Sequence, residues 1–136
     1  MNAYSNTAAA SRYRQTEVLT TSGVQLVVLL YDSAIQAIEL ASDGIARRHQ
    51  PDKARFLGRA VGIVCELSSV LDVERGGEIA KSLYRLYEYI LWEFTQANLR
   101  NDARHLDGPL RCLKEMRGAW HTVAQQQDQP ISLVRG

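Results

Sequence analysis

Cysteine is scarce in this chain of 136 residues, which contains only Cys65 and Cys112. Two cysteines exclude a disulfide framework or a multi-cysteine zinc site as the organising device of the fold. Proline and glycine are also few, with three and nine residues, so long stretches of the chain carry no helix breaker. This scarcity of breakers favours helices over strands.

An excess of one charge and a long apolar run are lacking as well. Sixteen basic residues nearly balance fifteen acidic ones, giving a net charge of +1. A strong nucleic-acid binder usually carries a marked basic excess, so we expect no nucleic-acid partner. The longest unbroken apolar run, Leu26 to Tyr31, is far shorter than the roughly 20 residues that span a bilayer. With no secretory signal apparent either, we expect a cytoplasmic protein without membrane insertion.

The spacing of apolar residues predicts two helices in the first half of the chain. The first begins near Ser22, which forms a capping box with Gln25, and runs to about His49. Its apolar seam, at alternating intervals of four and three, is Val27, Tyr31, Ala34, Ile38, Ala41 and Ile45. Pro51 suits the first turn of the second helix. The seam of that helix is Phe56, Ala60, Ile63, Leu67 and Val70.

A third helix is predicted after Gly76 and Gly77, which supply the backbone freedom for a tight connection behind Asp72. One face of this helix carries Ile79, Leu83, Leu86, Ile90 and Ala97, with Tyr84, Tyr87, Leu91 and Phe94 beside it. That pattern predicts an amphipathic helix that packs this face against the core.

A fourth helix is predicted after Asn101 and Asp102, which can end one helix and cap the next. Its apolar residues are Leu106, Leu110, Leu113, Met116, Trp120 and Val123. Gly108 and Pro109 predict a kink or a late start, because a proline inside a helix costs about 3 kcal/mol.

Four amphipathic helices joined by short connections predict an all-α fold, an antiparallel four-helix bundle over residues 22–124. Residues 1–21 are rich in Asn, Ser, Thr and Ala and predict a mobile N-terminal arm. Residues 125–136 begin with a glutamine-rich stretch and predict a disordered C-terminal tail.

Residues for catalysis, metal binding or cofactor binding do not assemble into a set. Gly76-Gly77 lacks the lysine of a phosphate-binding loop. Asp102 with His105 is the closest match to the Glu-x-x-His pairs of a di-iron bundle, but a charge at a helix start explains Asp102 better. We therefore expect no enzyme, metal or cofactor. An alternative stays open in which His121 accepts a phosphoryl group, as in a phosphotransfer bundle.

The first predicted helix carries more apolar residues than one packed face needs. Leu26, Leu29, Leu30 and Leu40 fall away from its seam, on flanking or opposite faces. On the third helix, Tyr89 and Trp92 lie opposite Leu83, among charged neighbours. We predict that these six residues contact a partner segment. The N-terminal arm could instead cover the leucines, and homodimerisation through the surplus apolar face is a further alternative.

Several strings of the sequence form an ordered series. They are Tyr13 with Ser22 nine residues on, Leu29-Leu30-Tyr31-Asp32, residues 71–80, Leu86-Tyr87-Glu88-Tyr89, residues 97–102 and Ala119-Trp120. In order and spacing these strings resemble the flagellar secretion chaperone family, FliS. The match covers about residues 12–123. The chain departs from the family's pattern at Gly23, where proline is usual, at Ser82, where asparagine is common, and at Trp92 and Gly108-Pro109.

The resemblance implies a chaperone that binds the C-terminal segment of newly made flagellin, which is disordered before polymerisation. It implies that the chaperone prevents premature filament formation and delivers flagellin to the export gate of the flagellar type III apparatus. A co-chaperone could join the complex. In the family the N-terminal arm can occupy surface that flagellin needs, so Tyr13 is expected to contact either the export gate or the binding groove.

Overall fold

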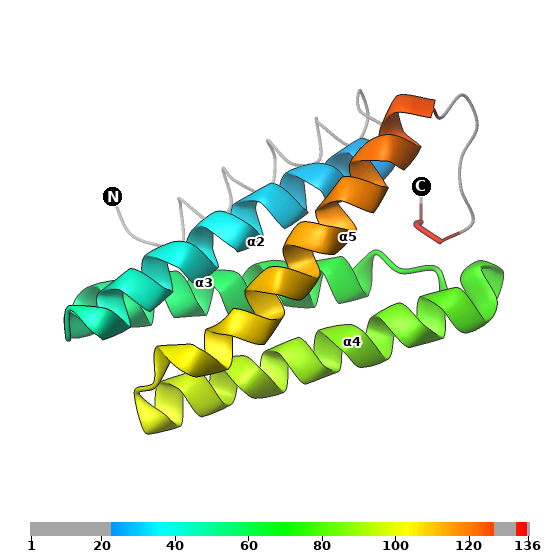
Figure 1. The fold of residues 1–136 in the computed structure, drawn as a ribbon. Helices are drawn as coiled ribbons and strands as arrows, with labels where there is room; N and C mark the ends of the chain where they lie inside the picture. The colour runs from blue at the N-terminus through cyan, green and yellow to red at the C-terminus, as the bar shows by residue number, and fades with distance from the viewer. Residues whose placement is uncertain (1–22, 127–132, 136) are drawn as a thin grey trace, which may run out of the picture.

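The computed structural model describes residues 23–126 and 133–135, and the predicted N-terminal arm lies outside these ranges (Figure 1). Within them the α-helices are α2 (Gly23–Ala46), α3 (Gln50–Ser69), α4 (Val73–Arg100) and α5 (Asp107–Gln126). A 3-10 helix, η1 (Ala103–Leu106), precedes α5. Strand pairing among the described residues is limited to one isolated bridge, Leu71 with Val134. The predicted all-α fold with its helix order is confirmed.

Helix α2 is the centre of the bundle. All six residues of its predicted seam are buried, with Tyr31, Ala34, Ile38 and Ala41 fully excluded from solvent. The helix contacts α3, α5 and η1. By length and composition α2 is apolar enough to cross a membrane, but 56% of its most apolar window is buried inside the bundle. A helix buried in a protein core can be as long and as apolar as a membrane-spanning helix, so the high hydropathy of α2 is consistent with its packing in the bundle.

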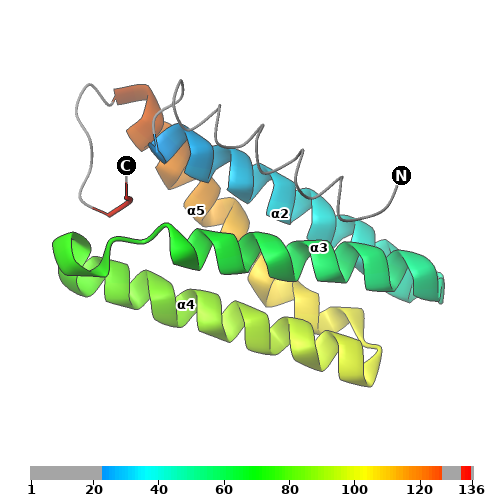
Figure 2. The same ribbon diagram turned by 180° about the vertical axis from the view of Figure 1, so that it is seen from behind.

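Helix α3 presents a different face from the predicted one. Ala60 and Leu67 are buried as expected, but Phe56, Ile63 and Val70 are only partly buried. Leu57 and Val64, one residue further along, take the central positions. The sequence offers two overlapping apolar stripes here, and packing between α2 and α4 selects the second one (Figure 2).

The connection from α3 to α4 depends on Asp72 and Gly77. The Asp72 carboxylate accepts a hydrogen bond from the Arg75 amide at 3.1 Å and so caps the first turn. Gly77 has φ 57° and ψ −134°, a backbone conformation that side chains disfavour, and the helix is broken there. The predicted break at the glycine pair is confirmed, although helical residues already begin at Val73.

The start of α5 explains how the chain tolerates Pro109. Asp102 caps η1 by accepting a hydrogen bond from the Arg104 amide at 2.9 Å, and hydrogen bonds from Arg104 lower the pKa of this carboxyl to about 2. Helix α5 then begins at Asp107, so Pro109 falls in its first turn, where its missing N–H needs no partner. The late start predicted for this helix is confirmed.

Helix α5 does not close the bundle along α4. The two helices meet at η1 and then diverge, as α5 crosses toward the start of α2 (Figure 1; Figure 2 from behind). Helix α5 packs mainly on α2 and makes little contact with α4. Among the helices of residues 23–126, the bundle is therefore open on one side, toward the C-terminal end of α5.

The C-terminal tail differs from the predicted disordered segment. Helix α5 continues to Gln126, beyond the predicted boundary, and residues 133–135 lie in extended form at the α3–α4 connection. The amide of Asp72 donates to the carbonyl of Leu133 at 3.0 Å, and Val134 is 9% exposed. The polar residues 125–129 dominate the composition of the tail and obscure the short apolar pair that docks.

The Gly77 conformation gives a stability prediction. Gly77→Ala should lower the free energy of unfolding by about 1–3 kcal/mol, because a methyl group strains this backbone. Gly62→Ala is the matched control, since Gly62 lies in α3 with nothing within 4 Å of an added Cβ. The control should raise stability by about 0.5–1 kcal/mol through helix propensity. Denaturant unfolding measures both, and equal effects would contradict a strained Gly77.

Candidate partner-binding surfaces

The N-terminal half of α4 turns part of its predicted core face toward solvent. Ile79, Leu83 and Leu86 lie on the same face as Ile90, because they precede it at helical intervals. Ile90 is 0% exposed, whereas Ile79 is 62% exposed. Leu83 and Leu86 are only partly buried. The prediction that Ile79 belongs to the core is wrong, because α5 has diverged from α4 at this level.

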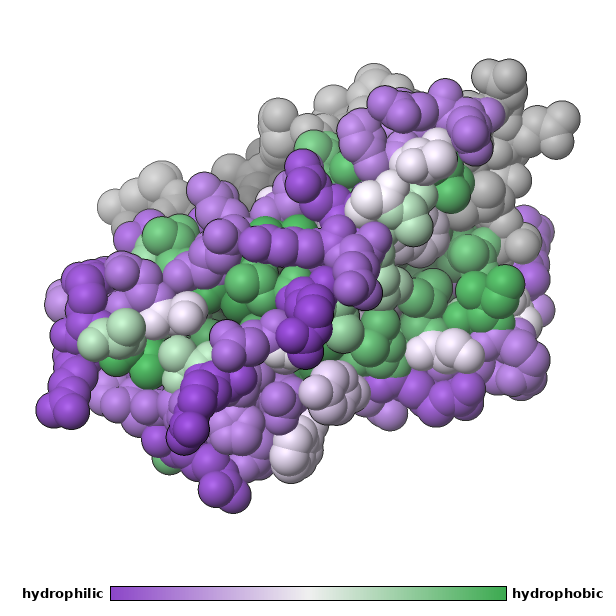
Figure 3. Space-filling view, viewed as in Figure 1, coloured by the Kyte–Doolittle hydropathy of each residue, from purple (hydrophilic) through white to green (hydrophobic). Residues whose placement is uncertain are grey.

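Helix α5 contributes Met116 and Val123, which are partly buried, to the other side of this opening. Arg117 and His121 line the hollows along α2, and helical spacing places Met116 and Val123 together on a different side of α5. Figure 3 shows hydrophobic side chains gathered between the C-terminal part of α5 and the N-terminal part of α4. We call this surface, formed by Ile79, Leu83, Leu86, Met116 and Val123, the open face.

A buried aromatic cluster lies at the inner edge of the open face and joins three helices. The hydroxyl oxygens of Tyr31 on α2 and Tyr87 on α4 are 2.5 Å apart. The ring centroids of Tyr31 and Trp120, on α5, are 6.4 Å apart. The Tyr31 hydroxyl also donates to the Met116 sulfur at 3.9 Å. Burial raises the pKa of both tyrosines above the ordinary value, so both stay protonated in the fold.

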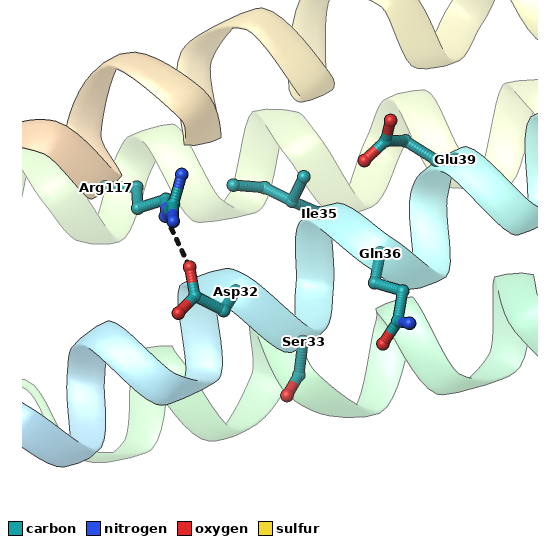
Figure 4. Close-up of a pocket in the computed structure, with 6 residues that line it drawn as sticks. All are labelled: Asp32, Ser33, Ile35, Gln36, Glu39 and Arg117. Atoms are coloured by element: carbon teal, nitrogen blue, oxygen red, sulfur yellow. Dashed lines mark ion pairs between the residues drawn. The ribbon is translucent and has the colours of Figure 1, made fainter.

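A second surface lies between α2 and α5. A largely apolar hollow of about 420 Å³ is lined by Gln25, Val28, Leu29, His121, Ala124 and Gln125. A neighbouring hollow of about 350 Å³, lined by Asp32, Ser33, Ile35, Gln36, Glu39 and Arg117, continues it along α2 (Figure 4). An ion pair between Arg117 and Asp32 connects the two helices. We call these two hollows the α2/α5 groove, which changes from apolar to polar along α2.

The structure distributes the residues predicted to bind a partner over separate surfaces. Leu29 is 45% exposed and lines the apolar end of the α2/α5 groove, and Leu40 is 36% exposed further along α2. Leu26 and Leu30 are buried in the core cluster, so this fold does not present them to a partner. Tyr13 lies outside the described residues.

The predicted aromatic contacts, Tyr89 and Trp92, are 46% and 56% exposed on α4. Helical spacing places them on a different side of α4 from Ile79 and Leu83. The Tyr89 hydroxyl lies beside Gly108 at the start of α5. If Gly108 carried a Cβ atom, that atom would be 3.3 Å from the Tyr89 hydroxyl oxygen. The structure therefore does not bring these aromatics together with the predicted leucines.

The open face was missed because its members have the periodicity of core residues. The direction in which α5 crosses the bundle depends on its packing against α2, and the spacing of apolar residues does not report that direction.

The histidines and other possible metal ligands are scattered over the described part of the chain. Among the described residues, no group of three His, Cys, Asp or Glu side chains is placed to hold a metal ion. His105 faces the Glu93 carboxylate at 3.3 Å, and this contact links η1 to α4. His121 is exposed and lines the apolar end of the α2/α5 groove. The surfaces on this chain are thus suited to binding apolar segments.

Comparison with known proteins gives consistent matches over most of the chain. The family model described as flagellar protein FliS matches residues 5–127. The flagellar secretion chaperone FliSB of Pseudomonas aeruginosa is 35% identical over 100 residues, 74% of this chain and 79% of that protein. The flagellar secretion chaperone FliS of Salmonella typhimurium is 33% identical over 111 residues, 81% and 82% of the two chains. The Vibrio cholerae protein of the same name is 33% identical over 99 residues, 73% of each.

Substitutions at Ile79 and Ile90 test whether the N-terminal half of α4 is uncovered. Ile90→Ala should lower the free energy of unfolding by about 2–5 kcal/mol, because it leaves a cavity in the core. Ile79→Ala should change it by no more than about 0.5 kcal/mol, because the side chain is exposed. Chemical denaturation of the two variants provides the comparison. A large loss for Ile79→Ala would show that another element covers the open face.

The buried tyrosine pair predicts a loss of stability in alkali. Unfolded tyrosines ionise near pH 10.0, but burial raises the folded pKa of Tyr31 and Tyr87 above that value. Their contribution is therefore fully present below pH 10 and decreases as the pH rises above it, by about 1.4 kcal/mol per pH unit for each tyrosine. Tyr87→Phe removes one of the two tyrosines, so the free energy of unfolding should fall less steeply above pH 10, by about 1.4 kcal/mol per pH unit. Tyr84→Phe, at an exposed position, should leave the slope unchanged, and identical slopes in both variants would contradict the account.

Proposed function

The chain belongs to the FliS family of flagellar proteins, and from this premise we propose that it is an export chaperone for flagellin. The relatives are named flagellar secretion chaperones. We propose that the client is the C-terminal segment of flagellin, which is disordered before assembly. The observation that carries this proposal is the open face, where no helix among the described residues 23–126 covers the apolar stripe of α4.

The open face has the chemistry to receive an amphipathic helix. Ile79, Leu83 and Leu86 follow each other at intervals of four and three, which keeps them on one face of α4. An amphipathic helix can lay its own apolar face on such a surface. Burying their exposed area would contribute about 25 cal/mol for each Å². Ordering a disordered segment opposes binding by about 2–5 kcal/mol. A client that extends from the open face onto the α2/α5 groove would offset that cost with further buried surface.

The biological consequence follows from covering this segment of the client. A flagellin segment held on the chaperone is not free to pack against other subunits, so polymerisation in the cytoplasm is prevented. The complex would then carry flagellin to the export gate of the flagellar type III apparatus. A role for Tyr13 in contacting that gate, and the participation of a co-chaperone, remain predictions. The near-neutral charge of the chain suits a client recognised by apolar contact.

Substitution of the open face tests this function directly. Leu83→Asp should weaken binding of a peptide with the sequence of the flagellin C-terminal segment by about tenfold or more, because it places a charge in the apolar contact. Leu99→Asp is the matched control, since Leu99 is 73% exposed on the opposite side of α4. Isothermal titration calorimetry gives both dissociation constants, and circular dichroism verifies that each variant is folded.

Three results would contradict the proposal. They are equal affinities of the two variants, absence of binding by the unaltered chain, and sedimentation of that chain as a dimer that ignores flagellin. Leu29→Asp and Trp92→Asp, measured in the same way, test whether the α2/α5 groove and the aromatic pair on α4 also contact the client.

A further inference from the structure

The last described residues of the chain occupy a backbone docking site at the α3–α4 connection. Arg135 donates its amide to the carbonyl of Val70 at 2.9 Å, and Asp72 donates its amide to the carbonyl of Leu133 at 3.0 Å. These two bonds frame the antiparallel bridge between Leu71 and Val134. Residues 70–72 therefore present a donor and an acceptor that pair with any extended chain, whatever its side chains.

Two glycines let the tail approach the helices closely. A Cβ added at Gly23, the first residue of α2, would lie 3.3 Å from both the Arg135 carbonyl oxygen and a Val134 methyl group. Those are the contacts within 4 Å at this position among the described residues. A Cβ at Gly76 would lie 2.6 Å from the Cβ of Ala80 and 3.1 Å from a Leu133 methyl group, so both α4 and the tail crowd this position. The site is thus a narrow slot with two bare backbone walls, which suits an extended segment with small or branched apolar side chains.

The position of the slot connects it with the open face. Leu133 lies against Gly76, which precedes Ile79 on α4 by three residues. Figure 1 shows the C-terminal segment between the end of α5 and the start of α4, at the wide end of the opening. A peptide that leaves the open face in extended form at this end meets the slot next.

We propose that this slot binds an extended apolar stretch of the client, and that residues 133–135 fill it until the client displaces them. The inference rests on the proposed function, since it assumes a client on the open face. The tail shows the ligand chemistry: two adjacent apolar residues whose backbone pairs with residues 70–72. Strand addition of this kind takes its affinity from main-chain hydrogen bonds and its selectivity from neighbouring side chains. A client that is already bound at the open face is held close to the slot, so its binding there is effectively intramolecular. The tail is part of the same chain, and the two segments therefore compete for the slot on similar terms.

Amide hydrogen exchange, read by NMR, tests the displacement. In the free chain the amides of Asp72 and Arg135 should both be protected. When a peptide of the flagellin C-terminal segment saturates the chain, exchange at Arg135 should accelerate at least about tenfold as its hydrogen bond is lost. Asp72 should stay protected, because a client carbonyl replaces that of Leu133. A complex in which Arg135 keeps its protection would overturn the displacement alone, whereas absence of any complex would overturn the proposed function with it.

Two substitutions separate release of the tail from blockage of the slot. Val134→Asp should release the tail and tighten client binding by about threefold or more, because the self-competitor is gone. Adding Gly23→Leu to that variant should weaken binding again, because its side chain fills the space that Val134 vacates. Gly62→Leu is the matched control, at a helix position with nothing within 4 Å. Unchanged or weaker binding by Val134→Asp, or equal binding by the two leucine variants, would overturn the proposal.

Discussion

The contact of Tyr31 with Tyr87 beneath Trp120 is the constraint on which the arrangement of helices depends. It joins α2, α4 and α5 at one level of the core, with the two hydroxyl oxygens 2.5 Å apart. A buried hydroxyl without a partner is costly, so the pair fixes the register of α2 against α4. Trp120 packs against Tyr31 and so holds α5 against α2. Beyond this level α5 packs along α2, and within the described part of the chain α5 does not cover the N-terminal half of α4.

The open face and the C-terminal slot are two consequences of this path. Because α5 begins only at Asp107 and then crosses toward α2, no helix among residues 23–126 covers the stripe through Ile79, Leu83 and Leu86, in which Ile79 is exposed and the two leucines are only partly buried. The widening gap also leaves space at the α3–α4 connection, where the tail bridges Leu71. A protein that must hold an unfolded client needs such exposed apolar surface, and a closed four-helix bundle would not offer it.

Local interactions made much of the fold predictable from the sequence. The seam of α2, the cap at Asp102, the break at the glycine pair and the late start of α5 each depend on neighbouring residues, and all are confirmed. The predictions that proved wrong depend on contacts between segments that are distant in the sequence. The exposure of Ile79, the rotated face of α3 and the docking of Val134 depend on where another segment lies. Periodicity identifies an apolar face but does not say which element covers it, so Leu26 and Leu30 proved buried while Leu29 lines a groove.

The central claim is that a flagellin segment occupies the face that α5 leaves open. Methyl-labelled NMR spectra of the chain, titrated with a peptide of the flagellin C-terminal segment, test this claim most directly. The account predicts that the largest shift changes fall on Ile79, Leu83, Leu86, Met116 and Val123, with smaller changes at core methyls such as Ile38. Saturable binding whose shift changes are confined to residues outside the open face would contradict it.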